Sequence, residues 1–323
     1  VNALAAAGEL ETIDKLTGVY DWLVKQQYWE PHPYTGADPG AWAWTSLPGG
    51  VPDADDTPGA IIALCQLERC KSCREALAVD SSRAWHRWGF ARNWLLALQN
   101  RDGGWPTFCR GWGNLPFDRS GTDLTAHAMR AFMQLSFLRG QFDRAYFERL
   151  YGRSVARGLA FLARTQRPDG SWLPLWFGNQ YAANDENPTY GTARVLAAYR
   201  DLDMMNSEPA RRGVAWLLSA QDPDGGWGGA AGVVSSIEET ALAVEVLLDA
   251  GSDVAGAVNN GLAWLVQQVE AGGLHDPTPI GFYFAKLWYF EKLYPIIFTV
   301  AALGRALKKA TGRHEPAHRE DPP

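Results

Sequence analysis

The sequence lacks an excess of basic residues: its 323 residues include 30 Lys and Arg against 36 Asp and Glu, a net charge of −6. Nucleic-acid-binding proteins usually carry a basic patch or stripe, so we set that class aside. Apolar runs of the roughly 20 residues that cross a bilayer are also missing, as is a charged-then-apolar leader. We expect a cytoplasmic or peripheral (monotopic) membrane protein that is not secreted.

Cysteine is scarce, with four residues at Cys65, Cys70, Cys73 and Cys109. Cys70 and Cys73, together with Cys65 and His86, could be read as zinc ligands, but no second Cys-x-x-Cys follows. We therefore favour free thiols in a reducing compartment, and we expect no metal and no other cofactor.

Tryptophan, by contrast, is abundant, with fifteen residues, and much of it belongs to an internal repeat. Residues 94–105, 161–172 and 216–227 align, and in each a Gln precedes a Trp by six positions across an Asp-Gly turn. Weaker copies begin at Trp22 and Trp264, which makes five units. Repetition at this spacing is typical of architectures built by stacking one supersecondary unit.

Each repeat ends an amphipathic helix and leads, after a loop, into a second helix rich in Ala and Leu. We expect these second helices over residues 58–67, 124–138, 192–202, 238–248 and 296–309. The pattern predicts an all-α fold, an (α/α)6-type toroid of repeated helical hairpins with an inner and an outer ring. The toroid should be a catalytic domain over residues 1–311, its first hairpin truncated, followed by a disordered polar tail at 312–323.

Inner helices that start at a common end would gather the residues just ahead of them. These are residues 53–57, 121–123, 188–191, 235–239 and 282–294. The repeats themselves should brace adjacent hairpins, because a Gln amide can satisfy free backbone groups at a helix end and a Trp ring can stack on the neighbouring helix. We do not expect Trp105, Trp172 or Trp227 to contact substrate.

Three carboxylates crowd into the segment Asp53-Ala54-Asp55-Asp56-Thr57, directly before an apolar helix. Each charge raises the proton affinity of its neighbours, so at least one carboxyl should keep its proton near neutral pH and could act as a general acid. The alternative is a helix start with Asp56 or Thr57 as the N-cap and Pro58 in the first turn. Capping requires only one of the three carboxylates.

The repeats and the acidic segment together resemble the class II terpene cyclases, above all squalene-hopene cyclase. A third match is Asp123-Leu124-Thr125-Ala126-His127, which is similar to that family's Asp-Val-Thr-x-His segment. The resemblance runs from about residue 16 to 305 and concerns the carboxyl-terminal catalytic half, the β domain. It implies a cyclase that converts a linear triterpene such as squalene to a hopene-like polycycle through carbocations, without a metal.

The resemblance also implies roles for single residues. Asp55 would protonate a terminal alkene, His127 would hydrogen-bond to Asp55, and Asp53 and Asp123 would orient the cluster. Asp56 would cap the helix or serve the structure. Asp123 and His127 are four positions apart and share one helix face.

Aromatic side chains outside the repeats are candidates for substrate contact, because their ring faces attract cations. Core packing is the alternative for about half of them. Trp44 and Trp176 are the strongest candidates, and Tyr190 matches a family Tyr-Gly-Thr segment. The full set is Trp44, Phe108, Trp112, Phe117, Trp176, Tyr190, Phe282, Phe284, Tyr289 and Phe290.

Other functions stay open at this point. One is a class II cyclase of shorter prenyl diphosphates, and another is a non-catalytic isoprenoid-binding toroid or an inactive half-enzyme. A protein prenyltransferase β subunit would bind zinc and a partner chain, and a carbohydrate-active toroid would leave the triple Asp unexplained. The expected partners are an isoprenoid small molecule, an amino-terminal domain or a second copy of the chain, and a membrane surface.

Overall fold

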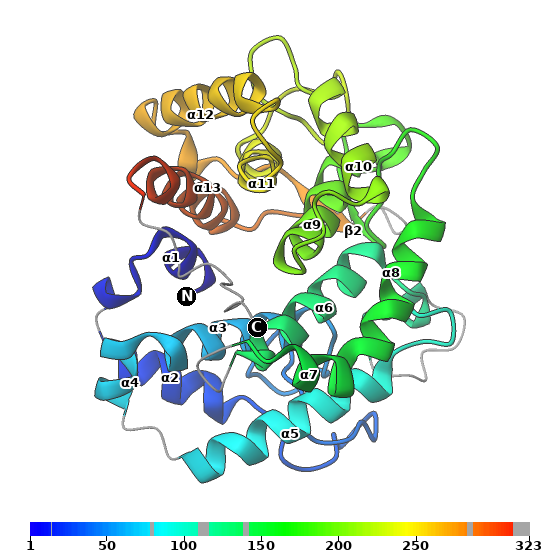
Figure 1. The fold of residues 1–323 in the computed structure, drawn as a ribbon, viewed down its shortest axis with the longest axis vertical. Coiled ribbons are helices and arrows are strands. Elements are labelled where there is room, and N and C mark those ends of the chain that lie inside the picture. Colours follow the sequence, from blue (N-terminus) through cyan, green and yellow to red (C-terminus); the bar gives the residue numbers. More distant parts are fainter. Residues whose placement is uncertain (14, 78–80, 109–115, 138–141, 283–286, 313–323) are drawn as a thin grey trace, which may run out of the picture.

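The structure is a computed structural model that describes residues 1–13, 15–77, 81–108, 116–137, 142–282 and 287–312. Over these residues the chain is a series of helices with one small sheet (Figure 1). The helices are α1 (Asn2–Ala7), α2 (Leu16–Lys25), α3 (Asp56–Arg69), α4 (Lys71–Leu77), α5 (Ser81–Leu98), α6 (Thr122–Ser136), α7 (Arg144–Phe147), α8 (Arg153–Thr165), α9 (Pro188–Asp201), α10 (Glu208–Ser219), α11 (Ile237–Leu247), α12 (Ala255–Glu270) and α13 (Tyr294–Ala310). Short 3-10 turns lie at Leu10–Thr12, Pro116–Asp118, Ala183–Asp185 and Gly273–His275, and a π turn at Glu148–Gly152 joins α7 to α8.

Within the described residues, α1, α3, α6, α9, α11 and α13 pack side by side and close into an inner ring. The short α1 completes this ring, because it contacts both α13 and α3. The helices α2 and α4 lie outside α3, α5 and α8 outside α6, α10 outside α9, and α12 outside α11 (Figure 1). The predicted toroid is therefore confirmed, and each of the five predicted inner helices is present within a few residues of its expected bounds.

The three glutamines of the central repeats make the same pair of hydrogen bonds. Gln99 Nε2 donates to the carbonyl of Gly103 at 2.8 Å and to that of Ser154, in the first turn of α8, at 2.9 Å. Gln166 bonds Gly170 and Pro209 in the same way, and Gln221 bonds Gly225 and Ala257. Each amide thus ties its own turn to the start of the next outer helix, as the sequence predicted.

The repeat tryptophans are fully buried braces. Trp105, Trp172 and Trp227 have 0% of their surface exposed, and each indole N–H donates at 2.8 Å to a carbonyl ten residues earlier in the preceding outer helix. A glycine of the following outer helix faces each ring: Gly158, Gly213 or Gly261. The prediction that these tryptophans are structural is consistent with their complete burial.

A second contact joins each repeat to its inner helix. The backbone N–H of Trp172 donates to the Thr192 hydroxyl at 3.0 Å, and Thr192 lies one turn inside α9. The same bond links Trp42 to Thr57, Trp105 to Thr125, and Trp227 to Thr240. The start of every one of these inner helices is fixed to a loop by the same geometry.

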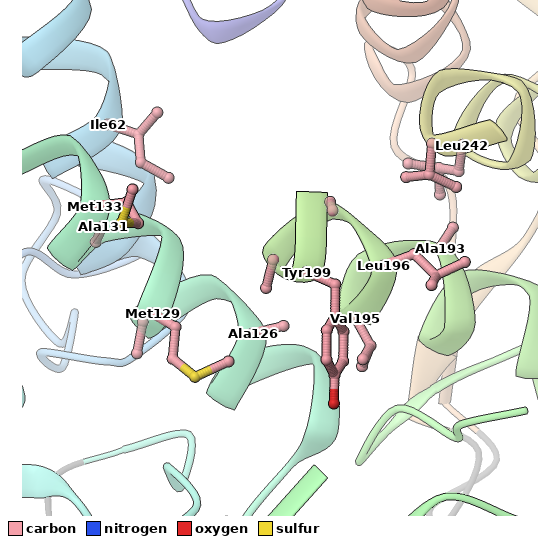
Figure 2. Close-up of a cluster of buried hydrophobic side chains, with 14 of the residues drawn as sticks. Ile62, Ala126, Met129, Ala131, Met133, Ala193, Val195, Leu196, Tyr199 and Leu242 are labelled. Carbon is pink, nitrogen blue, oxygen red and sulfur yellow. The ribbon is translucent and has the colours of Figure 1, made fainter. Parts of the chain in front are cut away.

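The inner helices bury their apolar faces against one another (Figure 2). Side chains from α3, α6, α9 and α11 meet there, among them Ile62, Met129, Leu196 and Leu242. Burying such side chains contributes roughly 1.5–3 kcal/mol each relative to leaving them in water. The ring is thus held by continuous apolar contact between neighbouring inner helices.

A small antiparallel sheet lies at the amino-terminal end of the inner helices. It consists of β1 (Phe177–Gly178), β2 (Ile280–Phe282) and β3 (Leu287–Tyr289) in the order β1-β2-β3. Phe177 pairs with Phe282, so the loop before α9 is joined to the segment before α13. Residues distant in sequence are thereby held at one end of the ring.

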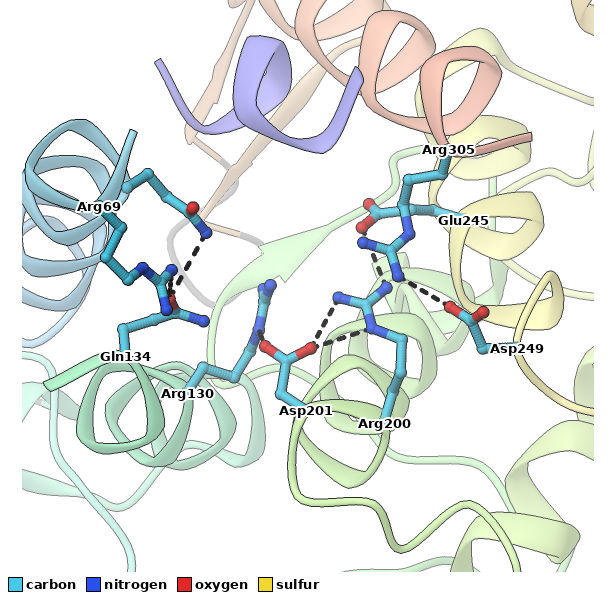
Figure 3. Close-up of polar contacts among 9 residues, drawn as sticks. Arg69, Arg130, Gln134, Arg200, Asp201, Glu245, Asp249 and Arg305 are labelled. Atoms are coloured by element: carbon cyan, nitrogen blue, oxygen red, sulfur yellow. Dashed lines mark hydrogen bonds and ion pairs between the residues drawn. The ribbon is translucent and has the colours of Figure 1, made fainter. Parts of the chain in front are cut away.

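Ion pairs occupy the other end of the inner ring (Figure 3). Asp201 accepts from Arg130 at 2.7 Å and from Arg200 at 2.9 Å, and Arg200 also pairs with Glu245 at 3.1 Å. Further contacts there join Arg69 to Gln134, Gln66 to Gln134, and Arg305 to Asp249. These residues lie toward the carboxyl ends of α3, α6, α9, α11 and α13, so the two ends of the ring differ in chemistry.

Replacing Gly213 by Ala tests the Trp bracing. A Cβ at this position would lie 2.7 Å from the Trp172 ring and 3.3 Å from Leu196. We expect a loss of about 1–3 kcal/mol in the free energy of unfolding, measured by chemical denaturation. Gly89→Ala, in α5 with no atom within 4 Å of the new Cβ, is the control and should stabilise by roughly 0.5–1 kcal/mol. Equal effects at the two positions would contradict the bracing role.

Asp201→Asn tests the ion pairs. Burial alone would raise the pKa of Asp201, but the charges of Arg130 and Arg200 outweigh it and hold the pKa well below its ordinary value. A depressed folded-state pKa gives stability that is present above the unfolded pKa of about 3.9 and is lost as pH falls. We expect the variant to lose about 3 kcal/mol at pH 7, and the difference from wild type to shrink in acid. The Asp253→Asn variant, at an exposed position, should have the wild-type free energy of unfolding both at pH 7 and in acid.

Candidate active site

Asp53 forms the base of the acidic segment. Its side chain is 2% exposed, and its Oδ1 accepts the backbone N–H groups of Asp55 at 2.8 Å and of Asp56 at 2.6 Å. The capping role predicted for Asp56 or Thr57 is therefore wrong: α3 begins at Asp56 with Asp55 as its N-cap, and the Asp53 carboxylate accepts the backbone N–H of both. Thr57 instead bonds the backbone of Trp42, and the Asp56 side chain is exposed.

Asp55 and His127 come together as predicted. Asp55 stands at the N-cap of α3, and its Oδ1 lies 3.3 Å from Nδ1 of His127, which projects from the second turn of α6. About 34% of the Asp55 side chain stays accessible against 14% for His127, so the carboxyl is not sealed by packed atoms. An accessible acid with a buried partner is an arrangement suited to proton transfer.

The four carboxyl groups of the cluster differ in proton affinity. Burial raises the pKa of Asp53 well above its ordinary value, and the nearby charges of Asp56 and Asp55 raise it further. Burial also raises the pKa of Asp123 to about 6, and the charge of Asp55 adds to the rise. Asp56 keeps an exposed surface, yet the protein atoms that surround its carboxyl group and the charge of Asp55 raise its pKa to about 6. The raised pKa values favour the protonated form of these three carboxyl groups.

Asp55 itself shifts in the opposite direction. Burial pushes its pKa upward, but the hydrogen bond from His127 and the charges of His127 and Arg194 outweigh this and lower the pKa. Burial lowers the pKa of His127 in turn. Burial and neighbouring charge thus favour protons on Asp53, Asp56 and Asp123 over a proton on Asp55. When Asp55 does carry a proton, its low pKa makes it the strongest acid of the four.

Asp123 links the cluster to the next loop. Its Oδ1 accepts the backbone N–H of Leu175 at 3.2 Å, and Leu175 immediately precedes Trp176. Asp123 is 5% exposed and begins the first turn of α6, one turn before His127. The predicted orienting role is consistent with this contact.

Four of the predicted aromatic residues join into one group. The ring of Trp44 lies 5.4 Å from that of Phe108, which lies 5.8 Å from that of Trp176. Phe117 contacts both Phe108 and Trp176, at 4.9 and 5.1 Å. A backbone bridge between Asp53 and Phe108 places this group beside the acid.

The group continues to α9. Trp176 neighbours Phe177, whose ring lies 5.1 Å from that of Tyr190. Tyr190 starts the first turn of α9, where the Asn187 side chain caps the helix by accepting its N–H. Burial raises the pKa of Tyr190, and the charges of Asp55 and Asp123 contribute to the rise.

The remaining aromatic candidates have varied positions. Tyr289, in β3, is partly buried and senses the Asp55 charge, whereas Phe290 is 60% exposed. The backbone of Phe282 lies in β2. Trp112 and Phe284 lie outside the described residues.

Two residues with an electrostatic effect on the acid, or from it, were not named as site candidates: Arg194 on α9, and Tyr294 at the start of α13, the last residue of the predicted range 282–294. Burial raises the pKa of Tyr294, and the charges of Tyr190 and Asp55 add to it. A sequence signal did exist for Arg194, because it follows Tyr190 by four positions and interrupts an apolar inner helix.

His, Cys, Asp and Glu side chains nowhere gather in threes at metal-binding distance in the part of the chain that the structure describes. Cys65, Cys70 and Cys73 are free thiols. Across the same described residues, every helix is too short or too polar to cross a membrane.

Known proteins resemble this chain over most of its length. The probable squalene–hopene cyclase of Sinorhizobium fredii is 28% identical over 91% of this chain and 47% of its own length. The drimenyl diphosphate synthase of Streptomyces showdoensis is 29% identical over 67% of this chain and 37% of its own length. The chain spans about half the length, or less, of these curated relatives.

Solved structures share the fold. The ent-copalyl diphosphate synthase from Streptomyces platensis superposes with a TM-score of 0.64 at 22% identity, over 94% of this chain and 48% of that one. The type II terpene cyclase MstE from Scytonema, in complex with merosterolic acid A, gives 0.59 at 18% identity, over 96% of this chain and 86% of that one.

A family model decides the assignment. Residues 1–308, which include the acidic segment, His127 and all of the repeats, match the model of the squalene-hopene cyclase C-terminal domain. The chain therefore belongs to the squalene-hopene cyclase C-terminal domain family, whose toroid is that of the class II terpene cyclases.

Proposed function

We propose that this chain cyclises a linear isoprenoid by protonating one of its double bonds, which is class II terpene cyclase chemistry. The observation that carries the proposal is the 3.3 Å contact between Asp55 and His127 beside linked aromatic rings. The reaction requires an acid, a partner for its conjugate base, and electron-rich walls. Asp55, His127 and the aromatic group would supply these in turn.

In the first step the carboxyl proton of Asp55 forms a new C–H bond at a terminal alkene. The π electrons of the alkene form this C–H bond while the O–H bond of Asp55 breaks, which leaves a C–C single bond, a tertiary carbocation and the Asp55 carboxylate. The π electrons of the next double bonds then close rings in sequence. The last cation loses a proton to a base or takes up water, so the reaction is an isomerisation when a proton is lost.

The aromatic group would stabilise the cations that move along the chain. A cation over an aromatic face gains roughly 0.5–2 kcal/mol, and more when water is excluded. Trp176 and Tyr190 are buried near the acid, while Trp44 is half exposed at the far end of the group. The series from Tyr190 to Trp44 is a candidate path for an extended substrate.

We infer a triterpene such as squalene as the substrate, with a hopene-like polycycle as the product, in line with the relative from Sinorhizobium fredii. A shorter prenyl chain with a polar head is the second candidate. Two comparisons favour this candidate: the drimenyl diphosphate synthase relative, and the complex of MstE with geranylgeranyl dihydroxybenzoate. This chain covers 85% of the MstE chain in that complex. An amino-terminal domain, a second copy of the chain and a membrane surface are proposed partners.

The test is to incubate the protein separately with squalene, farnesyl diphosphate and geranylgeranyl diphosphate, and to analyse the products by mass spectrometry. A cyclised product from any one of them supports the proposal and selects the substrate. Binding without conversion would favour the alternative of a non-catalytic isoprenoid-binding toroid or inactive half-enzyme.

Asp55→Asn should remove the proton donor while preserving the fold. We expect kcat to fall by roughly 10⁴-fold, since general acid catalysis contributes about 10²–10⁴-fold and no other group occupies this position. Exposed Asp276→Asn serves as the matched control and should keep full activity. Activity retained in Asp55→Asn, with an unchanged melting temperature, would refute the assignment of the acid.

The pH dependence should report the shared protons of the cluster. The pKa of Asp56 and that of Asp123 are each raised to about 6. Above this pH both carboxyl groups lose their protons, so Asp55 can no longer be reprotonated from them. We expect kcat/KM to be high below about pH 6 and to fall as pH rises through it. Asp123→Asn removes a negative charge that favours protonation of Asp55, so this limb should move to lower pH. A limb that does not move would contradict the coupling.

A further inference from the structure

The Cys-x-x-Cys pair, Cys70 and Cys73, lies apart from the candidate active site. It stands where α3 ends and α4 begins, whereas Asp55 lies at the other end of α3. Both cysteines are free thiols. The pair takes no part in the chemistry proposed above, so its own chemistry has to be read from its surroundings.

A tight turn brings the two thiol groups together. The backbone N–H of Cys73 donates to Sγ of Cys70 at 3.4 Å, and the N–H of Arg74 donates to the Cys70 carbonyl at 2.9 Å. In a helical turn, Cα atoms three residues apart are separated by about 5 Å. A disulfide joins Cα atoms that are roughly 4.4–6.8 Å apart, so a bond between these two sulfur atoms requires no large movement of the backbone.

The two thiol groups differ in access to solvent. Cys70 is partly exposed, and its Sγ lies 3.3 Å from the Ser72 hydroxyl. Cys73 is only 1% exposed. A dissolved reagent therefore meets Cys70 first, and Cys73 can react readily only with a group that Cys70 already carries.

The proton affinities agree with this difference. Burial raises the pKa of Cys70, but hydrogen bonds with the side chains of Cys73 and Ser72 outweigh it and lower the pKa. Burial raises the pKa of Cys73 to about 12, and the hydrogen bond and charge of Cys70 add to the rise. The contribution of the Cys70 charge disappears once Cys70 is bound to another sulfur, so the first reaction prepares Cys73 for the second.

We propose that Cys70 and Cys73 form a thiol–disulfide exchange site, which a small-molecule disulfide oxidises to an intramolecular disulfide. The Cys70 thiolate attacks one sulfur of the small disulfide, a mixed disulfide forms, and the first small thiolate leaves. The Cys73 thiolate then attacks the Cys70 sulfur, the bond between the two cysteines forms, and the second small thiolate leaves. The two protein thiols lose two electrons and two protons, which the small disulfide gains as it becomes two thiols.

The alternative is that the two cysteines only pack at the junction of the helices. In that case each would react independently, at a rate set by its own exposure, and no bond between them would form. Cys65 is a control within the same chain, because it is fully buried in α3 and burial raises its pKa above the ordinary range.

The test is to equilibrate the reduced, folded protein with glutathione and glutathione disulfide in graded ratios, and then to trap the remaining thiols by alkylation. Mass spectrometry of the intact chain should show the loss of two hydrogen atoms, and peptide mapping should locate a Cys70–Cys73 link that dithiothreitol reverses. Cys65 should stay reduced. The mapping separates this link from any modification of Cys109, which lies outside the described residues.

Single variants test the order of the two steps. Cys73→Ser removes the second thiol, so it should accumulate one glutathione at Cys70. Cys70→Ser removes the attacking thiol, so glutathione should reach Cys73 at least about tenfold more slowly. If either variant does not fold, the corresponding Ala variant provides the same comparison.

Two results would overturn the proposal. One is a wild-type chain in which both thiols are still alkylated after treatment with excess glutathione disulfide. The other is a wild-type chain that collects a mixed disulfide at Cys70 without the link to Cys73. Both outcomes are independent of the proposed function, because the readout is the covalent state of two thiols and not the conversion of an isoprenoid.

Discussion

The hydrogen bond between a loop Trp and an inner-helix Thr is the contact on which the site depends. It occurs at Thr57, Thr125, Thr192 and Thr240, each within the first turn or so of an inner helix. Thr57 follows Asp55 by two residues, and Thr125 lies between Asp123 and His127. The bond that fixes each helix start to its loop therefore also fixes the acid and its partner relative to each other.

The toroid separates two kinds of electrostatic environment. At the carboxyl ends of the inner helices, acidic and basic side chains pair closely: Arg130 and Arg200 pair with Asp201, and Arg200 also pairs with Glu245. At the amino-terminal ends, carboxyl groups gather with few cations, and burial and mutual repulsion raise the pKa of Asp53 and Asp123. Because the charges at the carboxyl ends of the inner helices are paired, the ring can tolerate a cluster of unpaired carboxyl groups at the amino-terminal ends.

Among the carboxyls, environment decides which one is the acid. Asp53 is buried and committed to two backbone N–H groups, Asp56 is exposed, and Asp123 holds the backbone of Leu175. Asp55 has the histidine contact, accessible surface and the nearby Arg194 charge. Three neighbouring carboxylates of one motif thus acquire different tasks because their surroundings differ, not because their chemistry does.

The sequence alone determined the hairpin repeat and the all-α toroid, because periodic Gln, Trp and Gly positions are local properties. The pairing of Asp55 with His127 was expected only from the resemblance to the class II terpene cyclases. Only the tertiary structure decided that Asp53 rather than Asp56 accepts the N–H groups at the start of α3, that α1 closes the ring, and that Arg194 lies against the rings of Tyr190 and Phe298. These depend on backbone direction at a helix start and on contacts between helices far apart in the chain. The proton affinities of the carboxyl groups also depend on the tertiary structure, because burial and neighbouring charge arise only once the inner helices have come together.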